Sequence, residues 1–323
     1  MQTYQITIEP LSPFGTPIKG DTLFGQFCWQ AAYDHSLLSI PLDEAITCHS
    51  QRPFAVFSSA FPALPDNGVA LKRPDAPLDL LFDFSGISKA DRIGKRKEHK
   101  KRKWLVCDKP GALADLTACR YLEAGDLSGT ETEHLRSHNS INRLTGTTGE
   151  GFVPYSQSLT LYPAGSRLVV FVGIESDLLS SESLRIGLDR IGAAGFGRDA
   201  STGMGKFRID GCREVDLAVF GAEAPNALYT LSPSVPETGR YRDALFAPFT
   251  RFGKHGDRLS ISGKPFKNPV IMADEGAVLF PADMAASRKR PYIGISLTGL
   301  SKIQETTVAQ GYSLYIPVRL EVN

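Results

Sequence analysis

The residues from Arg190 to Arg208 combine glycine with cationic and hydroxyl side chains, a composition suited to binding a phosphodiester backbone. Glycine accepts a positive φ without steric cost, so these residues can turn several backbone N–H groups onto one concave surface. Cations beside such N–H groups neutralise phosphates, and hydroxyl groups can bond phosphate oxygens or 2′-hydroxyls. We therefore predict an RNA contact in this glycine-rich loop (residues 190–206). The predicted contact residues are Gly192, Gly195, Gly197, Arg198, Ser201, Thr202, Gly203, Gly205 and Lys206.

Within the loop, residues 195–200 also satisfy the G-x-G-x-x-A pattern of dinucleotide-binding sites. That pattern requires a strand before it and a helix after it. Here the order is reversed. Upstream, Leu184 and Leu188 recur at helical spacing behind Ser180, which suits a helix N-cap, and downstream Lys206–Ile209 alternates as a strand does. The context therefore disfavours a cofactor-binding oxidoreductase, we expect no cofactor, and the alternative to an RNA contact is a flexible connection.

Further polar groups are candidates for RNA contacts elsewhere in the chain. Lys19 precedes a predicted helix N-terminus with Asp21 as N-cap, so it is either a phosphate contact or a solvated lysine. A glycine-punctuated basic loop contributes Arg251 and Lys254. Amide and guanidinium groups that suit base-edge and phosphate contacts lead into a run of turn-forming residues. This third group consists of Arg136, His138, Asn139, Asn142 and Arg143.

The densest positive charge lies between Arg92 and Lys103, where eight cations are offset nearby only by Asp91 and Glu98. A block of like charges is typical of a mobile solvated loop, and such a loop can also become ordered on a phosphate backbone. Both interpretations stay open. The shorter run Arg288–Arg290 reads as a surface turn.

Few residues suit metal binding or acid–base catalysis. His134 and His138 have the i, i+4 spacing of zinc-binding histidines, but the glutamate of the H-E-x-x-H motif and a third ligand are missing, so we expect no metal. His35 and His49 are candidates for the general base of a metal-independent endoribonuclease. No second acid or base stands at a telling distance from them in the sequence, so this alternative ranks second.

The elements around the loop predict an α+β fold. Strands are expected over 3–9, 158–162 and 167–174, and the last two of these should pair with each other. Helices are expected over 21–33 and 180–192. With the strand that follows the loop, this is the β-α-β-β-α-β order of ferredoxin-like and RNA-recognition domains. We place this first domain at 1–220, with an insertion at about 40–151. A degenerate second ferredoxin-like domain over 221–323 is predicted, with weak helical character at 241–249.

Composition limits the classes of protein that fit. The net charge is +1, so binding to a polyanion must come from local clusters of cations. Five scattered cysteines without C-x-x-C spacing argue against a disulfide scaffold or a structural zinc site. The first residues already alternate as a strand does, and no apolar run approaches the roughly 20 residues of a membrane helix. We therefore expect a cytoplasmic protein that does not bind membranes.

At the glycine-rich loop, G-F-G-R-D-A-S-T-G-M-G-K-F resembles the corresponding loop of the repeat-associated RNA-binding (RAMP) proteins of CRISPR systems. Within that superfamily the chain is most similar to the type III-A (Csm) subunit that holds the 5′ handle of the CRISPR RNA. Three other stretches carry the resemblance: G-D-T-L-F-G at 20–25, H-N-S-I-N-R-L-T-G at 138–146 and Q-G-Y-S-L-Y-I-P-V at 310–318.

The resemblance implies a non-catalytic subunit in antiviral defence. Its RNA partners would be the CRISPR RNA and, at a thumb-like hairpin formed by residues 134–155, the target RNA near the guide 5′ end. Its protein partners would be the Palm-domain large subunit and the repeating backbone subunit, which carry the catalytic activities. The processing endoribonucleases of the same superfamily carry their glycine loop near the C-terminus, whereas here about a hundred residues follow it.

Overall fold

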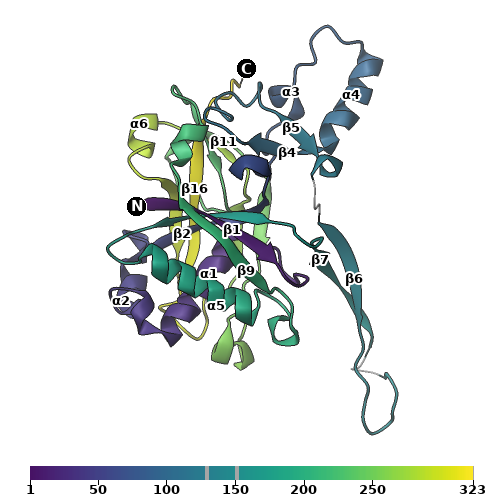
Figure 1. Cartoon of the computed structure of the whole chain (residues 1–323), viewed down its shortest axis with the longest axis vertical. Helices are drawn as coiled ribbons and strands as arrows, with labels where there is room; N and C mark the ends of the chain where they lie inside the picture. Colours follow the sequence, from purple (N-terminus) through teal and green to yellow (C-terminus); the bar gives the residue numbers. More distant parts are fainter. Residues whose placement is uncertain (128–130, 150–152, 323) are drawn as a thin grey trace.

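The computed structural model describes residues 1–127, 131–149 and 153–322, and its first sheet contains four antiparallel strands (Figure 1). Together with two helices, these strands follow one another in the predicted β-α-β-β-α-β order. In space the strand order is β2-β8-β1-β9. The elements are β1 (Gln2–Pro10), α1 (Gly20–Tyr33), β2 (Ala55–Pro62), β8 (Leu168–Ile174), α5 (Ser181–Ala194) and β9 (Phe207–Glu214).

Strand β8 is buried along its whole length because both faces of the first sheet are covered. On one face, Leu168 and Val170 join a core with Phe24 of α1 and Leu184 of α5. On the other face, Phe171 joins a second core that includes residues of the second sheet. A strand covered on both faces is apolar without alternation, which explains the run from Leu168 to Phe171.

Two predictions about the first sheet are wrong. Residues 158–162 do not pair with β8, because β7 (Tyr155–Leu161) pairs with β6 (Thr132–His138) instead. The place beside β8 is taken by β2, which lies inside the expected insertion at 40–151. The chain therefore leaves the first sheet only after Pro62. The hydrophobic residues of β2 gave no alternating pattern because most of this strand is buried on both faces.

The second sheet contains five strands in the order β11-β14-β10-β16-β15. Its strands are β10 (Ala227–Thr230), β11 (Tyr241–Leu245), β14 (Val278–Pro281), β15 (Tyr292–Leu297) and β16 (Ala309–Val318). The helical character predicted for residues 241–249 is wrong, since β11 and the start of β12 (Pro248–Arg251) occupy them. Strand β12 pairs with β13 (Val270–Ala273), and α6 (Met284–Ser287) is the short helix of this part of the chain.

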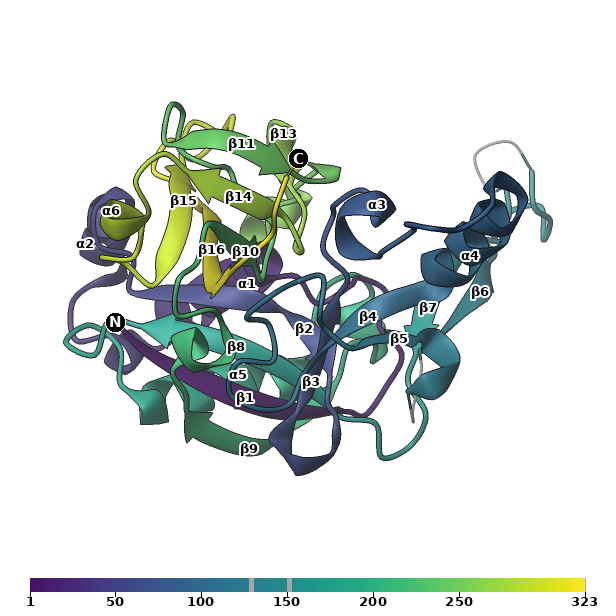
Figure 2. The same cartoon turned by 90° about the horizontal axis from the view of Figure 1, so that it is seen from above.

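The second sheet lies over the face of the first sheet that α1 and α5 leave open (Figure 2). At the junction, the buried side-chain amide of Gln310 on β16 bonds both backbone groups of Phe57 on the edge strand β2. Phe57 N donates to Gln310 Oε1 at 2.8 Å, and Gln310 Nε2 donates to Phe57 O at 2.7 Å. A Cβ at Gly20 would lie 2.0 Å from Phe57 O, so only glycine permits α1 to start this close to β2.

Two parts of the chain project from the same side of this body (Figures 1 and 2). One is the β6–β7 hairpin. The other is a small unit in which helices accompany the three-stranded sheet β3-β4-β5. Its elements are β3 (Val69–Lys72), α3 (Leu78–Leu81), α4 (Lys89–Lys101), β4 (Arg102–Cys107) and β5 (Tyr121–Glu123).

The basic run between Arg92 and Lys103, for which a mobile solvated loop was one of two interpretations, is ordered structure, because α4 and β4 contain it. The remaining short helix, α2 (Leu42–Thr47), lies beside α1. None of the helices within the described ranges combines the length and apolar character that crossing a bilayer requires.

The junction predicts a large cost for losing the Gln310 amide. In Gln310→Leu, the buried N–H and C=O of Phe57 lose their partner, and each unsatisfied group costs about 1–3 kcal/mol. We expect urea unfolding to show a loss of roughly 2–5 kcal/mol. The matched control Gln304→Leu, at an exposed position, should change the free energy of unfolding by less than about 0.5 kcal/mol. Equal effects of the two substitutions would contradict the assigned role of Gln310.

Candidate RNA interface

The glycine-rich loop begins where α5 ends and relies on left-handed backbone conformations. Gly195, Gly197, Gly203 and Gly205 have φ of 103°, 76°, 91° and 72°. Asp199 between them adopts φ 63°, which is unusual for a residue with a side chain. Each of these four positions therefore favours glycine, the residue that adopts a positive φ without steric cost.

Gly192 does not belong to this surface, and the prediction that it donates an N–H to RNA is wrong. It is buried inside α5. A Cβ at this position would lie 2.2 Å from the carbonyl oxygen of Phe207, so this glycine permits close packing of α5 on β9.

Most of the glycine N–H groups are used inside the protein, which corrects the predicted set of donors. Gly195 N donates to Ile191 O at 2.8 Å, Gly203 N to Ala200 O at 2.9 Å and Gly205 N to Pro13 O at 2.7 Å. Four N–H groups between residues 197 and 201 of the loop have no acceptor within residues 1–127, 131–149 and 153–322. They belong to Gly197, Asp199, Ala200 and Ser201.

Some side chains of the loop are bonded inside the protein, and others have no partner there. Lys206 and Ser201 are exposed and have no side-chain partner in the described part of the chain. Thr202 Oγ1 donates to Asp199 O at 2.9 Å, so this hydroxyl stabilises the loop itself. Arg198 Nη2 donates to Ser158 O at 2.6 Å, which ties the guanidinium group to the middle of β7. Lys206 and Ser201 are therefore the side chains that remain free for a phosphate.

The loop is held against residues 11–16, which connect β1 to α1. Lys206 N donates to Ser12 Oγ at 2.8 Å, and Arg198 N donates to Thr16 Oγ1 at 3.0 Å. From its other side the same connection pairs with β7 through Phe14, whose N–H and C=O bond Thr160. The glycine-rich loop, the 11–16 connection and the base of the hairpin are therefore one continuous structure.

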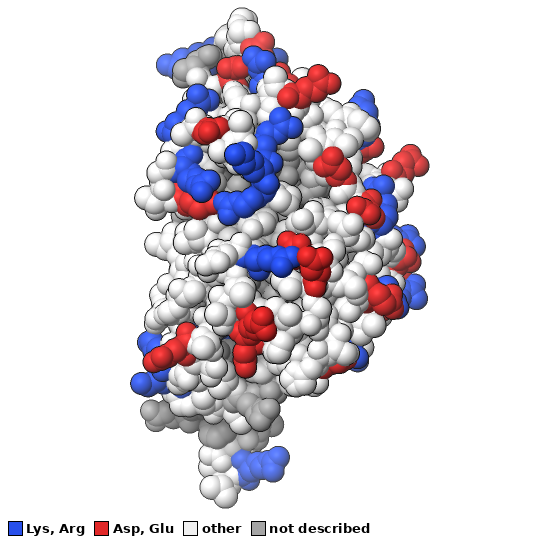
Figure 3. Space-filling model, turned by 90° about the vertical axis from the view of Figure 1, so that its left-hand side faces the viewer, with Lys and Arg blue, Asp and Glu red and all other residues white. Residues whose placement is uncertain are grey.

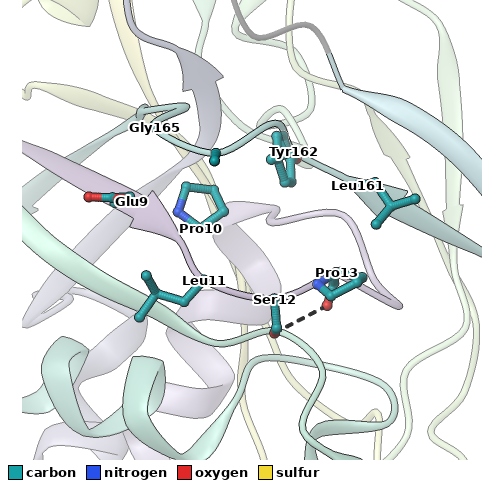
Figure 4. A pocket seen from close by; sticks show the side chains of 9 residues that line it. Glu9, Pro10, Leu11, Ser12, Pro13, Leu161, Tyr162 and Gly165 are labelled. Atoms are coloured by element: carbon teal, nitrogen blue, oxygen red, sulfur yellow. Dashed lines mark hydrogen bonds between the residues drawn. The ribbon is translucent and has the colours of Figure 1, made fainter.

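A recess of about 340 Å³ opens beside this junction (Figure 4). Its walls come from the end of β1 with the start of the 11–16 connection and from the turn that follows β7. The carboxylate at its rim, Glu9, is paired with Arg208 at 2.6 Å. Since the described residues that line the recess include no lysine or arginine, the recess is poorly suited to a phosphate. The lining residues are Glu9, Pro10, Leu11, Ser12, Pro13, Leu161, Tyr162, Ala164 and Gly165.

The β6–β7 hairpin carries the predicted contact residues between Arg136 and Arg143 away from the body (Figure 1). No side-chain partner occurs for Arg136, Asn139 or Arg143 among the described residues, so these side chains are free. Asn142 Oδ1 accepts from Leu144 N at 2.9 Å and so shapes the turn. The ring of His138 stacks on Tyr155 with centroids 5.1 Å apart.

His134 and His138 both lie on strand β6. Residues four apart in a strand are separated by about 13 Å, because each residue adds roughly 3.3 Å. Two imidazoles at this distance cannot bind one metal ion, which gives the physical reason for setting the metal interpretation aside.

Lys19 is not available to RNA, so the phosphate contact predicted for it is wrong. Its ammonium group lies 2.6 Å from Asp274 Oδ1 and 2.7 Å from Glu275 Oε1, and its side chain is only 13% exposed. Burial raises the pKa of the Glu275 carboxyl, and Lys19 opposes that shift. Lys72 adds a second cation at 3.2 Å from Asp274 Oδ2. Lys19 therefore joins α1 to the second sheet.

Arg251 has the same kind of role, and its predicted phosphate contact is wrong for the same reason. Its guanidinium group forms a two-bond pair with the buried carboxylate of Asp21, with Nη2 to Oδ1 at 2.7 Å. The prediction that Asp21 is the N-cap of α1 is wrong, because the helix begins at Gly20 and its N-cap is Lys19, which makes no side-chain capping bond. Both cations lie over the ring of Phe249, with Lys19 Nζ 4.6 Å and Arg251 Cζ 4.7 Å from its centroid. Lys254, the other cation predicted in this glycine-punctuated basic loop, is exposed, with Nζ 6.0 Å from the centroid of the Phe266 ring.

The two histidines of the nuclease alternative do not form a catalytic pair. His49 is fully buried, with Nδ1 2.7 Å from Ser296 Oγ and its ring against Phe24 and Tyr312. Burial lowers the pKa of His49 from 6.5 to about 4. A base with no solvent access cannot reach a 2′-hydroxyl, so the candidate role of His49 is wrong. His35 is exposed, and no described contact links it to His49.

A further basic surface was missed because its members lie some 50 residues apart in the sequence. Pairing of Tyr241 with Pro281, and the bond from Ala282 N to Arg240 O, bring the two segments together. Figure 3 shows Lys and Arg side chains gathered on this face of the molecule. The exposed or half-buried cations of the two segments are Arg240, Arg242, Arg288, Lys289 and Arg290. Only the β11–β14 pairing could have revealed this cluster.

Comparison with protein-family models and with curated proteins finds no match. Solved structures share the fold over the whole chain. A chain of the Csm1-Csm4 cassette in complex with cA4 superposes with a TM-score of 0.61 at 15% identity, covering 99% of this chain and 100% of that chain. For a chain of the cassette in complex with pppApA the TM-score is 0.58 at 17% identity, covering 100% of this chain and 99% of that chain. For a chain of the Csm3-Csm4 subcomplex in the type III-A CRISPR-Cas interference complex the TM-score is 0.53 at 11% identity, covering 100% of both chains.

The chain therefore has a mixed α/β fold, built on antiparallel sheets, that occurs among subunits of type III-A CRISPR-Cas complexes. Among those subunits it shares the fold of Csm4, the component common to these complexes.

The pKa of His49 predicts a pH-dependent stability. Between pH 6.5 and about 4 the unfolded chain binds a proton at this histidine and the folded chain does not, so stability falls as the pH falls. Comparing wild type with His49→Gln by urea unfolding at pH 7 and pH 4 isolates this contribution. We expect wild type to lose about 3 kcal/mol more than the variant over this interval. Parallel pH profiles would contradict the buried neutral imidazole.

The position of Lys19 predicts a structural phenotype for its removal. Lys19→Met leaves the buried Asp274 and Glu275 carboxylates without their nearest cation, which should destabilise the protein by roughly 3 kcal/mol in urea unfolding. Lys264→Met, at an exposed position without an ion pair in the described residues, is the control and should cost less than about 0.5 kcal/mol. Adding Glu275→Gln to Lys19→Met should recover part of the loss. A Lys19→Met protein as stable as the control would contradict the buried network.

Proposed function

We propose that this chain is a non-catalytic RNA-binding subunit of a type III-A (Csm) effector complex that holds the 5′ handle of a CRISPR RNA. The observation that carries the proposal is that the N–H groups of Gly197, Asp199, Ala200 and Ser201 have no acceptor among the described residues, and that the exposed ammonium group of Lys206 in the same loop has no partner there either. Backbone N–H groups and a lysine bind phosphates without reading the bases. The fold shared with Csm4 supports the same assignment.

The protein partners follow from the complexes in which that fold occurs. We propose that the chain assembles with a Palm-domain large subunit, as in the Csm1-Csm4 cassette, and with a repeating backbone subunit, as in the Csm3-Csm4 subcomplex. The β6–β7 hairpin is proposed to contact target RNA near the guide 5′ end. Its free side chains, Arg136, Asn139 and Arg143, suit phosphates and exposed base edges.

We also propose that the chain consists of two ferredoxin-like domains, 1–220 and 221–323. The order β2-β8-β1-β9 of the first sheet is the ferredoxin-like strand order. Four strands of the second sheet repeat it as β11-β14-β10-β16, with β15 added at one edge. Only the short α6 stands where the second helix of the repeat would be, between β14 and β16, so the second domain is degenerate.

The endoribonuclease alternative is less well supported. His49 is buried, and His35 has no described acid or base partner. Acid–base cleavage of RNA requires two such groups around one 2′-hydroxyl.

The test is binding of the purified full-length chain to a labelled repeat-derived RNA, with EDTA present, over a range of salt concentrations. We expect the RNA to be retained uncut. Lys206→Gln should reduce the slope of log K against log salt by about 0.7, the effect of one phosphate contact to a single strand. Lys264→Gln removes the same charge elsewhere and should leave the slope unchanged. Absence of binding, or cleavage within the repeat, would refute the proposal.

A further inference from the structure

Helix α4 is firmly anchored, although its sequence is a run of cations. Ser88 Oγ accepts from Asp91 N at 3.2 Å and caps the first turn. At the other end, Arg73 Nη1 donates to the carbonyl groups of His99 and Arg102 at 3.0 and 3.1 Å. A guanidinium group in this position satisfies carbonyls at the helix C-terminus and complements its partial negative charge.

One side of α4 uses its cations for attachment to the rest of the unit. Arg96 Nη1 donates to Asp79 Oδ1 at 2.7 Å, and Arg92 Nη2 lies 3.2 Å from the same carboxylate oxygen. Both guanidinium groups also lie over the ring of Phe84, at 5.7 and 5.8 Å. The ring of His99 stacks on Phe82 with centroids 4.0 Å apart. These contacts fix which side of the helix faces solvent.

The solvent side presents a separate set of lysines. At 3.6 residues per turn these lysines fall within an arc of about 120°, whereas Asp91 and Glu98 fall outside it. All four are exposed, and none has an ion pair within the described residues. We call this set the lysine face. It consists of Lys89, Lys97, Lys100 and Lys101.

We propose that the lysine face of α4 is a second binding site for an RNA phosphate backbone, separate from the glycine-rich loop. Four unpaired cations on one rigid surface, with the carboxylates of the helix turned away, complement a polyanion. Lysine contributes point charges that neutralise phosphates in any orientation. A protein partner fits less well, because protein interfaces are depleted in lysine and centred on aromatic or arginine anchors. On α4, Ile93 is the large apolar side chain exposed to solvent, and the described residues of the helix add no aromatic anchor to it.

The position of α4 indicates which RNA it would meet. Figures 1 and 2 both show α4 projecting from the same side of the body as the β6–β7 hairpin. An RNA that continues past the hairpin would therefore run along the side on which α4 lies. This inference rests on the proposed function, since it extends the path of the same RNA beyond its handle.

The test compares two charge-matched triple variants of the full-length chain. Lys97→Gln, Lys100→Gln and Lys101→Gln together remove most of the lysine face, and glutamine has nearly the helix propensity of lysine. The control removes three exposed lysines elsewhere, by Lys109→Gln, Lys264→Gln and Lys302→Gln. Each protein is titrated against repeat-derived RNA, against the same RNA extended by a guide segment, and against the extended RNA annealed to its target. Circular dichroism verifies that both variants are folded.

With extended RNA, we expect the α4 variant to lose about 2 units of the log–log salt slope, from three contacts of roughly 0.7 each. Its affinity should fall at low salt, approach that of wild type at high salt, and stay normal for the repeat-derived RNA. A loss with both extended RNAs supports contact with a single strand, and a loss with the annealed RNA alone supports contact with the duplex.

Two outcomes would overturn the inference: unchanged binding of both the extended RNA and the annealed RNA, or an equal loss in the control variant, which would indicate a net-charge effect. In both cases wild type still binds RNA and the proposed function stands. If wild type binds none of the RNAs, the proposed function itself fails, and the lysine face loses its basis with it.

Discussion

The hydrogen bonds between the Gln310 amide and the backbone of Phe57 are the constraint on which the two-sheet structure depends. Phe57 lies on β2, an edge strand whose outward N–H and C=O groups would otherwise be buried without partners. One amide supplies both a donor and an acceptor in the geometry of a strand neighbour. Gly20 allows α1 to begin directly above this point. Residues near both ends of the chain therefore meet at the edge of the first sheet and close it.

Around this junction, charges that the sequence suggested for RNA hold the protein together instead. Lys19 precedes α1 and Arg251 lies on β12, and both cations lie within 5 Å of the centre of the Phe249 ring, at 4.6 and 4.7 Å. Each has its own buried or half-buried carboxylates. A cation pays a large desolvation penalty on burial unless it is paired, so these contacts are specific to one arrangement of the two sheets. The cations left over for a polyanion lie at the glycine-rich loop, on the hairpin, on α4 and near α6.

The glycine-rich loop and the hairpin are mechanically connected. Arg198 bonds the backbone of β7, and the 11–16 connection bonds both the loop and β7. A phosphate held by the loop and a strand passing the hairpin would therefore be held in a defined relative position. Arg198 illustrates how one cation can serve the structure of a site without itself facing the ligand.

The sequence by itself determined the local elements and the conformation of the loop. Alternation predicted β1, helical spacing and Ser180 predicted α5, and the glycines at 195–205 indicated positive φ, because each signal depends on neighbours in the chain. The tertiary structure alone decided which polar groups are free. Whether Lys19 is paired, whether His49 is buried, and which loop N–H groups lack acceptors all depend on residues tens to hundreds of positions away. Burial and pairing are properties of the folded arrangement, so a residue's type and spacing cannot reveal them.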